Sequence, residues 1–330
     1  MKIQTPSRLH IVLIDLNGSY KRVDGGAGLT LAEPVFILES EPADRGVSID
    51  FAAGVTDEIQ KAAALKKVAS GAENMIKHLG LEDGFHFTVH QTYPAHSGLG
   101  SGTQMALAAG KLVSESAGRH FSSYELSCIV GRGGTSGIGT YAFDMGGFIV
   151  DGGHSLKEKS TFRPSSASDA KPPVLLGRYD FPEDWEVLVA VPHQGTCYSG
   201  KEELNIFRDY CPLPKAEVEQ MSHIVFMNMV PFVIEHDLEG FSYALDMIQT
   251  TAFNKLELRL QPPAVTKLMN DMRDAGAYGV GLSSLGPSVF TVFDKNNRGI
   301  VKATKELLGD DGDVIVTKAQ NHGAILTKDE

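Results

Sequence analysis

Cysteine is scarce in this 330-residue chain, which has only Cys128, Cys197 and Cys211, an odd number at spacings that match no metal-binding pattern. A disulfide framework is therefore not expected. No apolar run approaches the ~18 residues needed to span a bilayer, and residues 1–6 lack the apolar centre of a secretion signal. We expect a cytoplasmic protein with no membrane partner.

Basic residues are not in excess either: the chain has 30 Lys and Arg and 41 Asp and Glu, which gives a formal net charge of −11. Nucleic acids and anionic membranes demand a basic surface, so the charge excludes nucleic acid as the main partner. Single basic residues can still bind an anionic substrate. Hydrophobic residues make up 42% of the chain, enough for a sizeable core in one large domain or two closely packed ones.

The spacing of apolar residues predicts strands and helices in no regular βαβ alternation, which favours an α+β fold over a doubly wound sheet. The strand patterns cover residues 8–16, 35–40, 46–51, 85–92, 185–191, 279–285, 287–293 and 313–318. The helical patterns cover residues 57–79, a segment after 102, 122–130, 215–235, 238–256 and 262–275. A segment rich in Pro, Ser and Ala at 164–173 indicates an exposed loop, so we expect domains at 1–165 and 166–330.

A glycine-rich stretch at 94–102 lies between a strand pattern and a helical one. Glycines at 98, 100 and 102 allow positive φ angles and a close approach of a ligand, and the start of the helix offers unpaired N–H groups. The stretch therefore predicts a phosphate-binding loop, although a plain strand-to-helix turn is the alternative. Its expected binding residues are Ser97, Gly98, Leu99, Gly100, Ser101, Gly102 and Thr103.

Three segments together resemble the motifs of the GHMP kinase superfamily: residues 6–10 (Pro-Ser-Arg-Leu-His), the glycine-rich stretch, and residues 279–288 (Gly-Val-Gly-Leu-Ser-Ser-Leu-Gly-Pro-Ser). The resemblance implies a two-lobed fold, with a ribosomal-S5-like N-terminal lobe and a ferredoxin-like C-terminal lobe. It also implies that the third motif, with Ser284, turns back toward the phosphate site. A buried hairpin is a compatible reading of that motif.

Two glycines depart from the kinase pattern. Gly102 stands where the kinases carry a serine that binds magnesium, with Thr103 as the candidate replacement, and Gly139 stands where sugar and mevalonate kinases carry an aspartate. Because glycine cannot act as a general base, an ATP-dependent small-molecule kinase is only the second hypothesis. A nucleotide-sensing protein that has lost catalysis is the third.

Residues 6–29, 131–139 and 143–154 resemble the beta-ribofuranosylaminobenzene 5'-phosphate synthases, and this resemblance covers most of the chain. It implies an archaeal, homodimeric enzyme that joins phosphoribosyl pyrophosphate to 4-aminobenzoate or 4-hydroxybenzoate. Carbon dioxide and pyrophosphate are released, with Mg²⁺ as cofactor, in tetrahydromethanopterin biosynthesis. Such an enzyme must stabilise a departing polyanion, shield an oxocarbenium-like centre from water and orient the aromatic acid.

On this hypothesis the glycine-rich loop holds the pyrophosphate, and arginines bind the phosphates or the carboxylate through their guanidinium forks. The candidate catalytic residues are Arg8, His10, Asp24 and Asp144, and the candidate magnesium ligands are Thr103 and Asp24. Further candidates for substrate binding are Arg22, Arg132, Thr135, His154 and Ser284. The alternatives are surface ion pairs for the arginines, local turn hydrogen bonds for Asp24 and a core position for His10.

Overall fold

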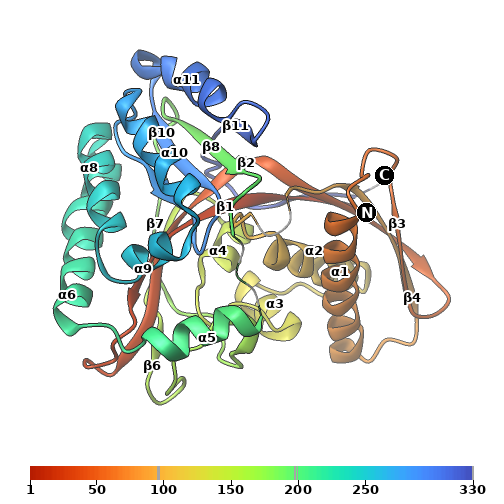
Figure 1. The fold of residues 1–330 in the computed structure, drawn as a ribbon. Coiled ribbons are helices and arrows are strands. Elements are labelled where there is room, and N and C mark those ends of the chain that lie inside the picture. The colour runs from red at the N-terminus through yellow and green to blue at the C-terminus, as the bar shows by residue number, and fades with distance from the viewer. Residues whose placement is uncertain (95–96, 197, 199, 329–330) are drawn as a thin grey trace.

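The computed structural model describes residues 1–94, 97–196, 198 and 200–328, which form two β-sheets with helices packed against them (Figure 1). Ala95 and His96 of the glycine-rich stretch, and Cys197, lie outside the described residues. The mixture of helices and strands confirms the predicted α+β class.

The larger sheet contains β1 (Lys2–Asp15), β2 (Arg22–Ala43), β3 (Val47–Phe51), β4 (Gly84–Gln91), β5 (Phe148–Asp151), β6 (His154–Ser155), β7 (Leu175–Tyr179) and β12 (Ile325–Thr327). Its main order is β12-β1-β2-β4-β3, with β5 and β6 also paired to β2 and β7 paired to β5. The β3–β4 pair is parallel, and the other pairs are antiparallel. Because β7 and β12 follow the predicted boundary at residue 165, the sheet draws on both predicted domains.

Strand β1 is buried along its length, as its sequence predicts, and Leu9, Ile11, Val12 and Ile14 all belong to the core. An irregularity in its pairing with β2 between His10 and Val12 interrupts the expected alternation of faces. Strand β2 extends far beyond the predicted 35–40. The prediction missed its first half, which contains glycine and alanine at 25–28. A Cβ atom on Gly28 would lie 2.5 Å from Ile138 Cγ2. Close packing thus requires glycine at position 28. A prediction based on β-branched residues misses the strand because glycine carries no strand signal.

Helices α1 (Glu58–Leu79), α2 (Ser101–Ser116) and α4 (Ile138–Asp144) pack against the larger sheet, and α3 (Ser123–Val130) packs against these three helices. Helix α2 contacts β1, β2 and the three other helices, and its residues 104–110 are all buried. The N-terminal end of α2 is therefore fixed at the centre of the fold, directly after the glycine-rich loop. Within the described part of the chain, no helix has both the length and the apolar character needed to cross a membrane.

The smaller sheet contains β8 (Glu186–Pro192), β9 (Gly281–Leu282), β10 (Val289–Phe293) and β11 (Gly312–Lys318), in the antiparallel order β11-β8-β10-β9. Its helices are α5 (Lys201–Tyr210), α6 (Lys215–Ile224), α7 (Val230–Glu235), α8 (Leu238–Gln249), α9 (Ala252–Leu260), α10 (Pro263–Asp274) and α11 (Gly299–Leu308). One helical block separates β8 from β9, and α11 separates β10 from β11. This β-α-β-β-α-β order is the ferredoxin-like arrangement, so the predicted fold is confirmed.

The helices of the second half differ in part from the sequence prediction. The expected helix at 215–235 is present as α6, a π-helical turn at Val225–Met229, and α7. The single helix expected at 238–256 is wrong, because the chain breaks after α8 and Ala252 adopts a φ of +47°. Helix α5 was not predicted, and with α9 it turns out to line the site described next.

Candidate active site

The three sequence motifs meet at one place, as predicted. The Arg8 amide of β1 donates to the Leu99 carbonyl of the loop at 3.0 Å. The Ser283 hydroxyl of the third motif donates to the Gly98 carbonyl at 2.9 Å. The Ser284 amide donates to the His10 carbonyl at 2.9 Å, which ties the third motif to β1. These contacts connect the two halves of the chain and fix the loop between them.

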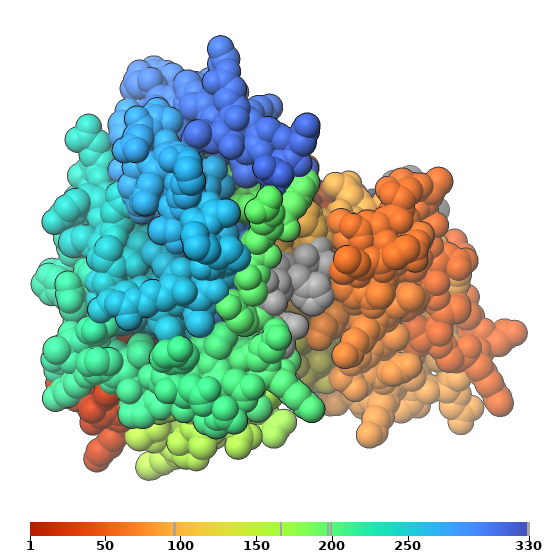
Figure 2. Space-filling model, in the orientation of Figure 1, coloured from red at the N-terminus to blue at the C-terminus, as the bar shows by residue number. Residues whose placement is uncertain are grey.

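Two adjoining cavities open at this junction. The loop cavity, of about 250 Å³, lies between the glycine-rich loop, α1 and α5. Figure 2 shows the orange residues of α1 and the green residues of α5 on the two sides of this region. The inner cavity, of about 190 Å³, lies between β1, α4, α5 and α9. The side chains that line both cavities are Arg8, Thr103, Arg132, Glu203, Ser284 and Leu285. The two cavities are therefore neighbours, and these side chains can contact a ligand in either one.

The loop cavity is built to bind an anion. Lys67 of α1, Arg8 and Arg132 all line it, together with the start of α2. Burial, followed by the charges of Arg132 and Lys66, lowers the pKa of Lys67, which indicates a crowded cationic environment. Gly98 and Gly100 adopt φ angles of +79° and +84°, so both positions need glycine. Three cations and a helix N-terminus outweigh the one carboxylate in the lining, Glu203, and together suit a multiply charged phosphate.

The structure explains both departures from the kinase pattern. A Cβ atom on Gly102 would lie 3.2 Å from Lys67 Cε, so a lysine fills the space beside this position. A Cβ atom on Gly139 would lie 3.1 Å from Thr103 Cγ2, so a threonine fills the space beside Gly139. A serine at 102 or an aspartate at 139 would require these neighbours to move. Such shifts are small, but glycine itself has no side-chain oxygen, so neither position can supply the magnesium ligand or the base of the kinases.

The polar part of the inner cavity contains His10 and Ser136. His10 Nε2 shares a hydrogen bond of 3.2 Å with Ser136 Oγ, and Ser136 Oγ lies 3.5 Å from the buried Asp151 carboxylate. Burial, with the nearby charge of Arg8, lowers the pKa of His10 to about 3. His10 is thus neutral at physiological pH and contributes hydrogen bonds, with no positive charge. Burial raises the pKa of Asp151 to about 7, against two backbone N–H donors that lower it.

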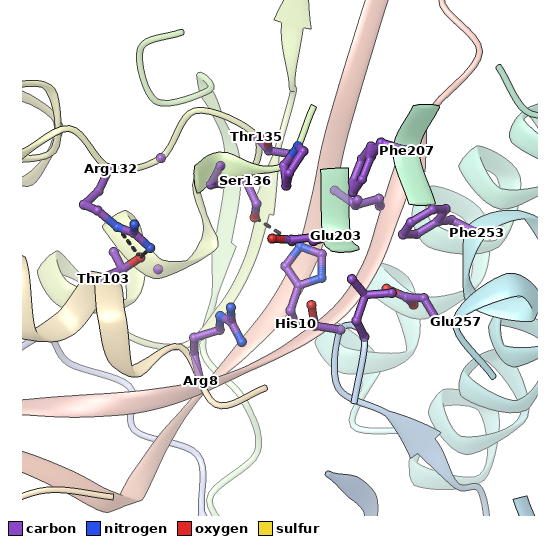
Figure 3. A pocket seen from close by; sticks show the side chains of 17 residues that line it. Arg8, His10, Thr103, Arg132, Thr135, Ser136, Glu203, Phe207, Phe253 and Glu257 are labelled. Carbon is purple, nitrogen blue, oxygen red and sulfur yellow. Dashed lines mark hydrogen bonds between the residues drawn. The ribbon is translucent and has the colours of Figure 1, made fainter. Parts of the chain in front are cut away.

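The other end of the inner cavity contains Phe207, Phe253 and the carboxyl group of Glu257, whereas Glu203 lies at the shared wall (Figure 3). Glu203 and Phe207 lie one turn apart on α5, and Phe253 and Glu257 lie one turn apart on α9. The two phenylalanine rings contact each other, with centroids 5.2 Å apart, and form one apolar wall. Glu257 is only 3% exposed, and burial together with the charge of Glu203 raises its pKa to about 8.

A buried ionic cluster supports the inner cavity from behind. Asp24 accepts a hydrogen bond of 2.9 Å from Lys159 Nζ and pairs with His154 Nδ1 at 2.6 Å. Lys159 Nζ also donates to Thr135 Oγ1 at 2.8 Å and to the Gly134 carbonyl at 2.9 Å. Because Thr135 lines the inner cavity, the cluster holds the backbone of that wall in place.

The structure brings together most, though not all, of the predicted site residues. Arg8, His10, Thr103, Arg132, Thr135 and Ser284 line the inner cavity, and Gly98, Gly100, Ser101 and Gly102 line the loop cavity. Ser97 and Leu99 are buried parts of the loop that line neither cavity. Arg22 donates to the Gly152 and Gly153 carbonyls, Asp144 is exposed at the end of α4, and Asp24 and His154 stay in the buried cluster.

The predicted magnesium ligands do not fit that role. Thr103 Oγ1 accepts hydrogen bonds of 3.0 and 3.3 Å from the cationic Arg132, and Asp24 is enclosed by Lys159 and His154. Among the residues that the structure describes, no group of three or more His, Cys, Asp or Glu side chains could hold a metal ion. A magnesium ion at this site would have to be held chiefly by oxygens of its substrate.

Sequence reasoning missed several residues that line or support the cavities: Lys67, Lys159, Glu203, Phe207, Phe253 and Glu257. The Glu-Phe pair on α5 and the Phe-Glu pair on α9 each have a spacing of four residues, which is a readable signal for one helix face. Neither pair points to a site until the fold brings α5 and α9 together.

Replacing Gly100 by alanine tests the loop cavity. The new Cβ would lie 3.0 Å from Arg8 Cγ and Nε, so we expect the Kd for inorganic pyrophosphate, measured by calorimetry, to rise by about tenfold or more. Gly118→Ala is the matched control, because Gly118 has a φ of +68° and nothing within 4 Å. Both variants carry the same backbone strain, so an equal loss of affinity in both would contradict the assignment.

Comparison with known proteins agrees with this geometry. Residues 64–147 match the GHMP kinases N terminal domain, and residues 229–304 match the GHMP kinases C terminal model. The solved structure of L. major mevalonate kinase, with a TM-score of 0.70, is 16% identical, and the match covers 97% of this chain and 96% of the kinase. Homoserine kinase from Cytophaga hutchinsonii, with a TM-score of 0.64, is also 16% identical and covers 98% and 96%. These two structural similarities show that the chain shares the fold of these kinases.

Two relatives with much higher sequence identity show to which family within this fold the chain belongs. The beta-ribofuranosylphenol 5'-phosphate synthase of Methanothermobacter thermautotrophicus is 47% identical, over 99% of this chain and 98% of its own. The protein of the same name from Methanocaldococcus jannaschii is 43% identical, over 98% and 99%. With such identity over nearly its whole length, the chain belongs to the beta-ribofuranosylphenol 5'-phosphate synthase family, on the GHMP kinase fold.

Proposed function

We propose that the protein is a decarboxylating phosphoribosyltransferase of tetrahydromethanopterin biosynthesis, joining phosphoribosyl pyrophosphate to a 4-substituted benzoate. One observation carries the proposal: a cationic loop cavity shares a wall with an inner cavity that has an apolar face. The relatives are named for a ribofuranosylphenol, which supports 4-hydroxybenzoate as the acceptor in preference to 4-aminobenzoate.

The loop cavity holds the pyrophosphate group in this proposal. As the bond from ribose C1 to the pyrophosphate oxygen breaks, its electron pair leaves with the pyrophosphate. Lys67, Arg132 and the amides at the start of α2 stabilise the charge that develops there. The ribose C1, left with oxocarbenium character, then lies at the shared wall beside Arg8.

The inner cavity holds the aromatic acid. The ring packs against Phe207 and Phe253, and its carboxylate faces the guanidinium of Arg8 at the shared wall. The ring carbon that bears the carboxylate attacks ribose C1 and forms the new carbon–carbon bond. Loss of carbon dioxide then returns the electron pair of the broken bond to the ring, which becomes aromatic again. Arg8 therefore positions both partners at the bond that forms.

Magnesium enters the proposal only as an ion bound to the diphosphate, because the predicted ligands Thr103 and Asp24 are occupied. A homodimer and a cytoplasmic location also stay predictions.

Product analysis tests the function directly. The purified protein would be incubated with phosphoribosyl pyrophosphate, magnesium and carboxyl-labelled 4-hydroxybenzoate or 4-aminobenzoate. We expect labelled carbon dioxide and pyrophosphate in equal amounts, and faster turnover with the hydroxy acid. A parallel assay follows ATP consumption with mevalonate, homoserine and galactose as acceptors. ATP turnover without release of carbon dioxide would overturn the proposal in favour of a kinase.

A further inference from the structure

The acidic end of the inner cavity has no part in the steps derived so far. Glu257 lies on α9 beside Phe253, 3% exposed, with its carboxylate lining the inner cavity only. Among the residues that the structure describes, no side chain donates a hydrogen bond to this carboxylate or forms an ion pair with it, and it opens onto the cavity. A buried carboxylate without a partner is costly, so its presence here points to a ligand that bonds to it.

The cavity is polarised along its length. Figure 3 places Arg132, Thr103 and Arg8 at one end and Phe207, Phe253 and Glu257 at the other. In a 4-substituted benzoate, the carboxylate and the attacking carbon lie at one end of the ring and the para substituent at the opposite end. When the attacking carbon is at the shared wall with Arg8, the para substituent therefore points toward Glu257.

We propose that Glu257 is the general base that accepts the proton of the para-hydroxyl group of the acceptor. This inference rests on the proposed function and adds a catalytic residue and a basis for acceptor choice. As the hydroxyl O–H bond breaks, its proton moves to a Glu257 carboxylate oxygen. The electron pair left on the oxygen is delocalised into the ring and drives attack of the para carbon on ribose C1. When carbon dioxide leaves, its bonding pair restores the aromatic ring, and Glu257 returns the proton to the oxygen.

The electrostatic surroundings suit this task. The charged and titratable groups that line the same cavity are Glu203 on α5, Arg8 and His10 on β1, and Arg132. His10 is neutral, and the two arginines are at the opposite end, so the nearest charge that acts on Glu257 is that of Glu203. Burial and this charge place the Glu257 pKa at about 8, close to the range in which a base both ionises and binds protons well.

Attack by 4-aminobenzoate depends less on a general base than attack by 4-hydroxybenzoate does. The nitrogen lone pair of 4-aminobenzoate can drive the attack while both N–H bonds stay intact. A hydroxyl acceptor gains much more from losing its proton. Glu257 therefore matters most for the hydroxy acid.

The test compares wild type and Glu257→Gln with three acceptors: 4-hydroxybenzoate, 4-aminobenzoate and 3,5-difluoro-4-hydroxybenzoate. The fluorines make the phenol acidic enough to be ionised at the assay pH of 8. We expect the variant to lower kcat for 4-hydroxybenzoate by about 10²-fold, with a smaller loss for 4-aminobenzoate. With the fluorinated acid, the variant should equal or exceed wild type, because no proton remains to be removed.

Exposed Glu202 on α5 gives the control, and Glu202→Gln should leave all three rates unchanged. Glu257→Asp is the second variant, and it should retain more activity with 4-hydroxybenzoate than Glu257→Gln does. Circular dichroism and a thermal melt of each variant exclude misfolding. Equal losses with all three acceptors, or no loss with 4-hydroxybenzoate, would overturn the role of Glu257. Failure of the wild type to release carbon dioxide from any acceptor would instead overturn the proposed function.

Discussion

Arg8→Met is expected to lower kcat/KM for phosphoribosyl pyrophosphate by about 10³-fold, since losing one partner of a buried charge contact costs roughly 2–5 kcal/mol. Arg8 lines both cavities and donates through Nη1 to the Gly98 carbonyl, so it orients the loop as well as both substrates. Burial lowers its pKa to about 10, which still leaves it positively charged at neutral pH. Steady-state rates of carbon dioxide release give the measurement.

Arg22→Met is the control for this effect. Arg22 was a candidate for substrate binding from the sequence, but the structure places it on the Gly152 and Gly153 carbonyls, and it lines neither cavity. We expect its kcat/KM to stay within about twofold of wild type. Arg8→Lys, which keeps the charge without the guanidinium fork, should recover only part of the loss. If Arg22→Met were as damaging as Arg8→Met, the assignment of the shared wall would be wrong.

Lys159→Met is expected to lower the free energy of unfolding by about 3–5 kcal/mol, because it removes one partner of a buried ion pair. Lys159 is 4% exposed, and its Nζ lies 2.9 Å from Asp24 Oδ2. Its loss leaves the Asp24 carboxylate with His154 alone and frees Thr135, so activity should fall as well. Urea denaturation measures the stability change.

The exposed Lys302–Glu306 pair provides the control for this variant. Its charged atoms are 3.7 Å apart, and the two side chains are 84% and 68% exposed. Lys302→Met should therefore change the free energy of unfolding by less than about 1 kcal/mol. A stability loss for Lys159→Met no larger than that of this control would show that the buried cluster does not stabilise the fold.

The parts of the fold predicted well from sequence are those where local pattern and tertiary environment agree. The alternation in β1 and the apolar spacing of α2 predict buried elements, and both are buried. Strand β2 was largely missed because Gly28 and its neighbours are selected for close packing and carry no strand signal. The break between α8 and α9 was missed because helical spacing continues across Thr250 and Thr251.

For the site, the glycine-rich loop was predictable because its function depends on backbone geometry, which glycine spacing records directly. The roles of Asp24 and His154 were not, because an ion cluster depends on Lys159, which lies 135 residues from Asp24 along the chain. Glu257 was unpredictable for a related reason. Nothing in its local sequence marks a glutamate as buried, and only the packing of α9 against β1 makes it so.

The most direct test of the whole account is a crystal structure with inorganic pyrophosphate and 4-hydroxybenzoate bound together. We predict the pyrophosphate at Gly98–Thr103, in contact with Lys67 and Arg132. The ring should lie against Phe207 and Phe253, with its carboxylate toward Arg8 and its hydroxyl oxygen within hydrogen-bond distance of Glu257. Pyrophosphate bound away from the loop, or a ring turned so that its carboxylate meets Glu257, would contradict the account.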